Sequence, residues 1–291
     1  MSRIGRRTFT VLLASTLLGI GGAAAARVSA APLTYVSLGD SYTSGPVIPV
    51  QIGTPRGCAR SNHNYPHDVA AALGLKLTDV SCSGATTANM AGSQSVSGGT
   101  NPPQLNALNS ATSRVTLGIG GNDIGFSSII SNCLAQTASG PTRVGPNCRD
   151  YYLAGGDQIA AAIRATAPKV TRVLQAIHRL APHARVLVIG YPAILPVSGG
   201  GCFPQMPFVN SDIPYLRAKE VQLNQMLAQV ASANGATYVD TYTPSATHNA
   251  CTPESSRWIE PVSPSAPAAP VHPNAAGEAG MATAVRSALA A

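Results

Sequence analysis

The chain has 291 residues, of which 19 are Lys or Arg and 12 are Asp or Glu, so its formal net charge at pH 7 is +7. Four of the 19 basic residues lie before Ala31, in a segment that we expect to be removed, so 15 remain against 12 acids and the remaining charge is about +3. With so small an excess, and no basic run interleaved with aromatic residues, we expect no nucleic-acid partner.

The first thirty residues have the features of an export signal. A charged start with three arginines precedes an apolar run over Phe9–Ile20, and Val28-Ser29-Ala30 then offers a cleavage site before Ala31. The apolar run is too short for a membrane-spanning helix. The segment Arg6-Arg7-Thr8-Phe9 is also similar to a twin-arginine signal, and an ordinary charged leader is an equal alternative. We therefore expect a secreted protein with residues 1–30 as signal peptide and no transmembrane segment in the mature chain.

Residues 31–291 suit one α/β domain, because short apolar segments alternate there with helical patterns. Several of the apolar segments are near-continuous, as strands covered on both faces tend to be. The predicted strands are Thr34–Leu38, Leu75–Ser81, Arg114–Ile119, Ala184–Ile189 and Ala236–Val239. The predicted helices are Tyr65–Leu73, Gly156–Leu180, Ile213–Ala233 and Ala275–Leu289. This alternation predicts a parallel sheet with helices on both faces.

Two helix details and three long loops follow from the same pattern. We expect Asp212 to cap the helix that starts at Ile213, and Pro168 to kink or split the long helix that contains it. The loops lie at about Cys133–Cys148 and Gly199–Ser211, and a proline-rich stretch runs from Pro261 to Pro273. Loops of this length in a compact domain usually carry a site or a lid.

All six cysteines lie after the predicted signal peptide, and an even count in an exported protein indicates disulfides. We favour sequential pairing, in which the second bridge closes a local loop rich in Gly, Pro and Asn. The pairs are then Cys58–Cys82, Cys133–Cys148 and Cys202–Cys251. The chain has no C-x-x-C pair, no H-E-x-x-H motif and no clustered ligands, so we expect neither a metal nor a cofactor.

Ser41 is the candidate nucleophile. The turn Gly39-Asp40-Ser41 leaves the first predicted strand sharply, which would expose the serine hydroxyl. A lone Gly-Asp-Ser is a weak signal, and the alternative is a serine that caps a helix. We interpret Asp40 as a turn residue that accepts backbone N–H bonds rather than as a catalytic acid, because neighbouring residues do not easily face one site.

Gly84 and Asn122 follow the second and third predicted strands. Asn122, in Gly120-Gly121-Asn122-Asp123, offers an amide N–H to a developing oxyanion, and the backbone N–H groups of Ser41 and Gly84 can supply two more donors. A glycine at position 84 also lets the backbone approach a substrate closely. The alternative for Asn122-Asp123 is a simple turn.

His272 is the candidate general base among six histidines. It follows the proline-rich stretch and precedes Pro273 and a helix, so its side chain is held at a junction; the alternative is a surface loop histidine. Ser41, Gly84, Asn122 and His272 all fall beyond the carboxyl ends of predicted strands, where ligands bind in open α/β sheets. The chain has no G-x-S-x-G motif, which argues against the common α/β-hydrolase plan.

These four segments, in this order, resemble the SGNH (GDSL) hydrolase family, over about Leu33 to Ala290. The cysteine pattern and the stretch from Trp258 to Asn274 look most like its secreted actinobacterial lipases and esterases. The resemblance implies a three-layer, flavodoxin-like α/β/α sandwich with a five-stranded parallel sheet, and carboxylic ester hydrolysis. It implies Ser41 as nucleophile, His272 as base, and Ser41, Gly84 and Asn122 as oxyanion donors.

One position departs from the family pattern. Many members carry an aspartate three residues before the histidine, and here that residue is Ala269. Similar secreted enzymes use a backbone carbonyl, so we expect the Ala269 carbonyl to orient His272 in a Ser–His dyad. A carbonyl fixes the imidazole tautomer but stabilises imidazolium less than a carboxylate does. Glu260 is the nearest upstream acid and is the rival partner.

The predicted function is a secreted serine hydrolase that acts on small-molecule or lipid acyl esters as a monomer. Phospholipase or carbohydrate O-deacetylase activity is the alternative within the enzyme class. A non-enzymatic module that binds lipid or glycan is the alternative outside it, and the complete Ser–Gly–Asn–His set argues against that reading. The acyl chain length and the alcohol are left open.

Overall fold

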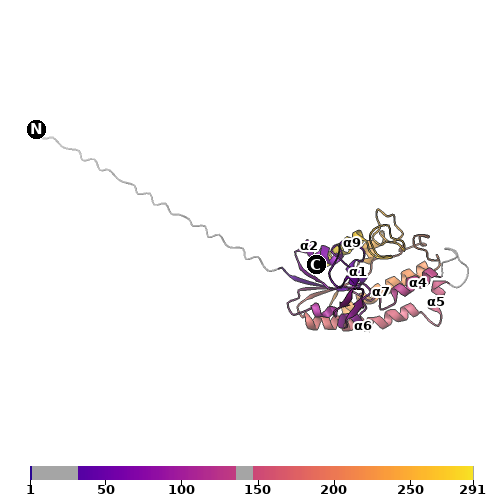
Figure 1. Cartoon of the computed structure of the whole chain (residues 1–291), viewed down its shortest axis with the longest axis horizontal. Coiled ribbons are helices and arrows are strands. Elements are labelled where there is room, and N and C mark those ends of the chain that lie inside the picture. The colour runs from indigo at the N-terminus through magenta and orange to yellow at the C-terminus, as the bar shows by residue number, and fades with distance from the viewer. Residues whose placement is uncertain (2–31, 136–146, 291) are drawn as a thin grey trace. The chain divides into compact units, whose positions relative to one another are not determined.

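A five-stranded parallel sheet with strand order β4-β1-β7-β8-β9 forms the centre of the fold in a computed structural model (Figure 1). The structure describes Met1 and residues 32–135 and 147–290, so the expected signal peptide lies outside the described residues except for Met1. The strands are β1 (Thr34–Gly39), β4 (Lys76–Asp79), β7 (Arg114–Gly118), β8 (Arg185–Ile189) and β9 (Thr237–Val239). All five predicted strands are confirmed, with small differences at their ends.

Helices cover both faces of the sheet. Helices α2 (Tyr65–Leu73) and α9 (Ala275–Ala290) lie on one side, and α6 (Gln158–Leu180) and α7 (Ile213–Ala233) lie on the other (Figure 1). Side chains alternate along β8 accordingly. Leu187 and Ile189 belong to the core under α2 and α9, whereas Val186 and Val188 belong to the core under α6 and α7. The predicted three-layer α/β/α architecture is therefore confirmed.

Shorter elements occupy the connections. The short helices are α1 (Ser41–Ser44), α3 (Ala88–Ala91), α4 (Phe126–Ala135), α5 (Cys148–Leu153) and α8 (Tyr242–Ser245), with 3₁₀ turns η1 (Arg56–Cys58) and η2 (Gln104–Ala107). Two antiparallel ribbons pair β2 (Gln51–Ile52) with β3 (Arg60–Ser61) and β5 (Gln94–Val96) with β6 (Gly99–Asn101). Most of these elements span a single turn or less, too little sequence for a periodic pattern to predict them.

The order in which strands are added to the sheet reverses between β1 and β7. The connection from β1 leads outward to β4 on one side, whereas β7, β8 and β9 follow one another on the other side. In open α/β sheets the connections diverge at such a point and leave a crevice at the carboxyl ends of the two strands. Gly39 lies beside Gly118 at those ends, so the segments that follow β1 and β7 flank the crevice.

Of the two helix details, the split at Pro168 is not observed and the cap by Asp212 is not formed. Helix α6 continues through Pro168 without being split. Pro168 has no N–H to donate to the Arg164 carbonyl, one turn earlier. Both residues are exposed, so water can bond that carbonyl. Asp212 stands at the start of α7 but makes no side-chain cap there. Its carboxylate instead accepts the backbone N–H groups of Cys148 (3.2 Å) and Arg149 (2.9 Å) at the start of α5.

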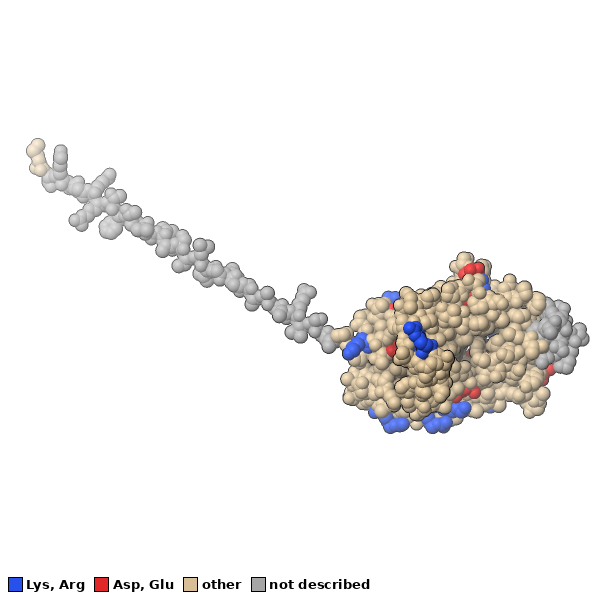
Figure 2. Space-filling view, in the orientation of Figure 1, with Lys and Arg blue, Asp and Glu red and all other residues tan. Residues whose placement is uncertain are grey.

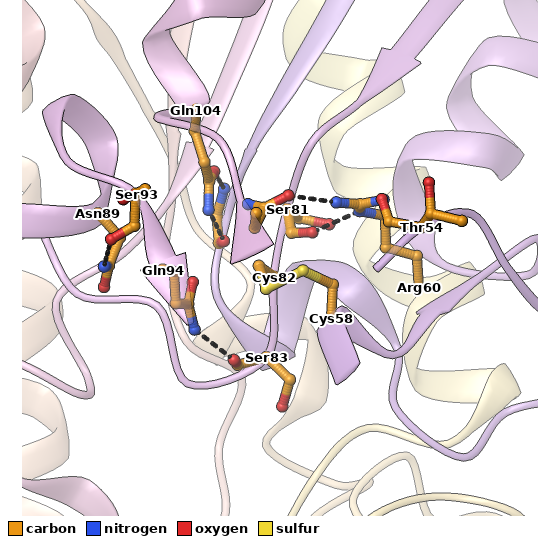
Figure 3. Close-up of a disulfide and its surroundings, with 12 residues drawn as sticks. Thr54, Cys58, Arg60, Ser81, Cys82, Ser83, Asn89, Ser93, Gln94 and Gln104 are labelled. Carbon is orange, nitrogen blue, oxygen red and sulfur yellow. Dashed lines mark hydrogen bonds between the residues drawn. A yellow bond between two sulfur atoms is a disulfide. The ribbon is translucent and has the colours of Figure 1, made fainter. Parts of the chain in front are cut away.

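The three disulfides pair sequentially, as predicted: Cys58–Cys82, Cys133–Cys148 and Cys202–Cys251. The first joins η1 to the segment after β4 and is drawn in Figure 3. The third joins the Gly199–Ser211 loop to the segment after α8. Within the described ranges, no helix is both long enough and apolar enough to cross a membrane.

Candidate active site

Ser41 begins the single-turn helix α1, directly above the carboxyl end of β1, and is 7 % exposed. Asp40 caps this helix, because its Oδ1 accepts the backbone N–H of Tyr42 at 2.9 Å. The turn needs glycine at position 39, since a Cβ atom there would lie 2.2 Å from Thr43 Oγ1 and 2.8 Å from the Gly118 carbonyl oxygen. Local packing therefore fixes the direction in which the chain leaves β1 and presents the Ser41 side chain.

His272 meets Ser41 although the two lie 231 residues apart in sequence. Its Nε2 is 2.8 Å from Ser41 Oγ, and its Nδ1 is 2.7 Å from the carbonyl oxygen of Pro270. Because a carbonyl only accepts hydrogen bonds, Nδ1 carries the proton and Nε2 is free to accept the Ser41 hydroxyl proton. Burial lowers the pKa of His272 below its usual value, and the bond to Pro270 opposes this shift.

The carbonyl beside His272 is that of Pro270, so the expectation of Ala269 is wrong by one residue. The Ala269 carbonyl instead accepts the backbone N–H of His272 at 3.2 Å. The reason lies in Val271, whose φ of 61° turns the chain back between Pro270 and His272. A positive φ is costly for a β-branched residue. Burial of the Val271 side chain and a 2.6 Å hydrogen bond from Tyr42 Oη to its carbonyl hold it in place.

Glu260, the rival partner, does not direct its carboxylate to His272. Oε1 accepts from Asn274 Nδ2 at 2.8 Å, and Oε2 accepts the backbone N–H groups of Ser265 (3.0 Å) and Ala266 (3.3 Å). Burial alone would raise the pKa of Glu260, but these hydrogen bonds and the nearby charge of Arg257 lower it. Glu260 is thus an ionised, fully buried group that organises the loop carrying His272.

The three expected oxyanion donors lie in segments that border the crevice. Asn122 uses one hydrogen of Nδ2 to bond the Ala85 carbonyl at 2.9 Å, which leaves the second hydrogen for another acceptor. Gly84 has a φ of 77°, which favours glycine, and sits between Ser83 and Ala85, whose N–H groups donate to Cys58 and Cys82. Within the described part of the chain, neither the Ser41 nor the Gly84 backbone N–H donates to a protein acceptor.

The segment before Gly84 is fixed from two sides (Figure 3). Cys82 is bonded to Cys58, and the adjacent Ser81 carbonyl accepts from Arg60 Nε at 2.6 Å. On the other side, Gln94 Nε2 donates to the Ser83 carbonyl at 2.8 Å. These contacts leave the Gly84 backbone little freedom to move relative to Ser41.

A buried hydrogen-bond chain that the sequence analysis missed connects the segments after β1, β7 and β8. The Tyr191 hydroxyl donates to Asp40 Oδ2 at 2.6 Å and accepts the Gly121 N–H at 2.8 Å. The Asn224 side chain in turn bonds both backbone groups of Tyr191. Burial raises the pKa of Asp40 to about 7, and the bonds from Tyr191 and Tyr42 limit the rise. Asp40 is thus a turn residue, as predicted, and also a link between loops.

An apolar pocket opens beside Ser41 and Asn122. Aliphatic and aromatic side chains from α4 and the turn before it, from α6 and α7, and from the loop before α7 form most of its wall. They are Ile124, Phe126, Ile129, Ile130, Ile159, Ile194, Leu195, Phe208, Leu216 and Leu223. Lys219 and Glu220 also line it. The wall is therefore mostly apolar next to the polar atoms of Ser41 and Asn122.

A cluster of charged side chains could form a second site. On the face drawn in Figure 2, Lys and Arg are scattered among uncharged residues rather than gathered into one patch. Among the residues that the structure describes, no group of three or more His, Cys, Asp or Glu side chains could hold a metal ion.

Comparisons with known proteins show the family to which the chain belongs. The model of the GDSL-like lipase/acylhydrolase family matches residues 37–279. Lipase 2 of Streptomyces coelicolor is 42% identical over 284 residues, which cover 94% of this chain and 93% of that protein. Lipase 1 of the same organism is 34% identical over 95% of this chain and 94% of its own length.

A similar solved structure is the extracellular lipase of Streptomyces rimosus, with a TM-score of 0.73 and 28% identity. The phospholipase A1 of Streptomyces albidoflavus NA297 has the same TM-score and identity, and each alignment covers 88% of this chain and 99% of the other. The family match, the relatives and the fold all lead to one assignment. The chain belongs to the GDSL-like lipase/acylhydrolase family and is a carboxylic ester hydrolase.

Proposed function

We propose that this protein hydrolyses acyl esters through a dyad of Ser41 and His272. The observation that carries the proposal is the 2.8 Å contact between His272 Nε2 and Ser41 Oγ, with Nδ1 bonded to a backbone carbonyl. His272 takes the Ser41 hydroxyl proton as Oγ forms a bond to the ester carbonyl carbon. It then gives that proton to the leaving alcohol oxygen as the ester C–O bond breaks. Water repeats the sequence on the acyl-enzyme and releases the acid.

The negative charge on the carbonyl oxygen would be held by the backbone N–H groups of Ser41 and Gly84 and by Asn122 Nδ2. Two features support this role: these backbone donors have no acceptor among the described residues, and Asn122 has a second amide hydrogen. Donors that are fixed before the reaction stabilise the oxyanion without reorganisation.

The Pro270 carbonyl takes the place of the usual carboxylate. It holds the Nδ1–H tautomer, and none of the described acidic side chains forms a hydrogen bond with His272. Glu260 supports the loop but does not take part in proton transfer. A dyad of this kind depends on the oxyanion donors for most of its charge stabilisation.

The substrate would be a lipid or small-molecule ester whose acyl chain enters the apolar pocket. The aliphatic wall beside Ser41 and the resemblance to Streptomyces lipases support this reading. Phospholipid esters are a second candidate, since a phospholipase A1 is among the similar structures.

We also infer export with cleavage between Ala30 and Ala31, by either the general or the twin-arginine route. Three disulfides and a similar lipase described as extracellular support export.

The proposal is tested with Ser41→Ala and a matched control, Ser44→Ala. Both serines lie in α1, but the Ser44 hydroxyl is buried without a hydrogen-bond partner. Ser41→Ala should lower kcat on 4-nitrophenyl esters by roughly 10⁶ and abolish labelling by a fluorophosphonate probe. Ser44→Ala should keep both. Labelling of the Ser41→Ala variant would refute Ser41 as the nucleophile.

A further inference from the structure

Glu220 stands in the wall of the apolar pocket. It belongs to the face of α7 that also presents Leu216 and Leu223 to the pocket. Leu223 approaches the Gly120 turn next to Asn122, so it marks the end of this face nearest the reacting atoms. A helix rises about 1.5 Å per residue, so Glu220 lies roughly one turn from Leu223 along α7. A chain attached at Ser41 that fills the pocket would therefore meet both side chains, since both line it.

The Glu220 carboxyl is only partly satisfied. Oε1 accepts the backbone N–H of Ile194 at 3.0 Å, and no described residue donates to Oε2. The adjacent Lys219 does not neutralise it, because Lys219 Nζ bonds Asp157 and Gln222 instead. The structure therefore leaves one oxygen of Glu220 available to a molecule in the pocket.

The surroundings favour the protonated carboxyl. Burial raises the pKa of Glu220 to about 8, and the bond from Ile194 limits the rise. At neutral pH the group is then mainly a carboxylic acid, with one O–H donor and remaining acceptor capacity. Tyr42 and Tyr242, whose pKa values the Glu220 charge would raise, carry no charge at that pH, because a tyrosine pKa is about 10 and burial raises it further.

An unsubstituted alkyl chain in the pocket would pack poorly against the Glu220 carboxyl. The chain would cover the carboxyl and offer it no hydrogen-bond partner, which disfavours binding. A chain with a hydroxyl or oxo group at that depth would satisfy the carboxyl and keep the remaining contacts apolar. Sites that hydrogen-bond a substrate group discriminate strongly against analogues without it.

We propose that Glu220 makes the pocket selective for acyl chains that carry a hydroxyl or oxo group partway along their length. This inference rests on the proposed ester hydrolysis, because it assigns the acyl chain to the pocket beside Ser41. It names the acyl part of the substrate and leaves the alcohol part unrestricted.

The test compares 4-nitrophenyl octanoate with a series of 4-nitrophenyl octanoates that bear one hydroxyl or one oxo group at successive carbons. The wild-type enzyme should prefer one position over the plain ester by roughly tenfold in kcat/KM, with neighbouring positions less favoured. Glu220→Leu should remove this preference and raise kcat/KM on the plain ester. Glu220→Gln, which keeps a donor and an acceptor, should retain most of it.

Gln225→Leu is the matched control, since Gln225 is an exposed residue of the same helix and does not line the pocket. It should leave the positional preference unchanged. A wild-type enzyme that hydrolyses the plain ester but prefers no oxygenated position would overturn the inference and leave the proposed function standing. Persistence of the preference in Glu220→Leu would also overturn it. Failure to hydrolyse any of these esters would overturn both.

Discussion

The two loops that complete the candidate site around Ser41 are held in place by different means. The Gly84 loop, residues 81–87, is fixed by the disulfide of Cys82 and by side chains that bond its backbone from outside. The His272 loop, residues 260–274, contains no cysteine and is organised by one buried carboxylate, that of Glu260. A covalent link withstands changes of pH and fails under reduction, whereas a buried carboxylate depends on its ionisation and its hydrogen-bond donors.

The difference matches what each loop must hold. In the proposed mechanism, the Gly84 loop presents a backbone N–H, which acts by position alone and gains from a rigid support. The His272 loop presents a side chain whose protonation would change during the proposed reaction, in surroundings that disfavour its charged form. The two loops can therefore be disturbed separately, and each disturbance has its own kinetic signature.

Among variants that keep both Ser41 and His272, the largest effect is expected from the loss of an oxyanion donor. Asn122→Ala should lower kcat by roughly 10²–10³ with little change in KM, because the lost amide acts mainly on the transition state. Steady-state kinetics on a 4-nitrophenyl ester measures both constants. Thr87→Val is the control: it removes the Thr87 hydroxyl bond to Asp123 but no oxyanion donor, and should keep kcat within a few-fold. Near-normal kcat in Asn122→Ala would remove Asn122 from the oxyanion hole.

The next largest effect is expected when the disulfide that holds the Gly84 loop is removed. Replacing both Cys58 and Cys82 by Ala should lower the free energy of unfolding by roughly 2–4 kcal/mol and also lower kcat, because Gly84 then loses its support. Replacing Cys202 and Cys251 should cost similar stability and leave kcat of the folded enzyme nearly unchanged. Denaturant titration and kinetics on each double variant measure the two quantities. Equal loss of kcat in both variants would contradict the special role of the first bridge.

The His272 loop should lose stability but little activity when its buried carboxylate is replaced. Glu260→Gln keeps an acceptor for Asn274 but turns an NH₂ group toward the N–H groups of Ser265 and Ala266, so we expect a loss of about 1–3 kcal/mol in stability. The folded variant should keep kcat within a few-fold. A loss of about 10⁴ in kcat, the size seen when a triad carboxylate is replaced, would mean that Glu260 acts on His272 after all. Glu254→Gln, at an exposed position of the preceding turn, is the control.

The regular part of the fold could be predicted from sequence because its cause is local. Apolar runs and helical periods mark the strands and long helices, and their ends agree within a few residues. Ser41 and Asn122, which closely follow β1 and β7, line one pocket, since neighbouring parallel strands end at one edge of the sheet.

The parts that could not be predicted arise from contacts between distant segments. Tyr191 bonds Asp40 across 151 residues, and no local pattern marks either as a partner of the other. Asp212 has the spacing of a cap for α7, but α5 offers its free N–H groups to the same carboxylate. His272 Nδ1 bonds the carbonyl of Pro270 rather than that of Ala269 because Val271 has a positive φ, which contacts with distant residues hold in place.

The smallest effect concerns pH. Burial disfavours the imidazolium form of His272, so its pKa lies below the usual value of 6.5. His272 then stays a neutral base as the pH falls through 6.5, and the acid limb of kcat/KM, which reports the free enzyme, should have its midpoint below that value. Asp40, with a pKa of about 7, also titrates in this range, so the profile is compared with that of Asp40→Asn. A limb caused by His272 should persist in that variant and be unmoved by Glu260→Gln, because the Glu260 carboxylate bonds Ser265, Ala266 and Asn274 rather than His272. A midpoint that lies above 6.5 in the wild type and decreases in the Glu260→Gln variant would instead indicate that the Glu260 carboxylate stabilises the imidazolium. The His272 loop would then provide electrostatic stabilisation as well as a base, and its role would no longer be distinct from that of the Gly84 loop.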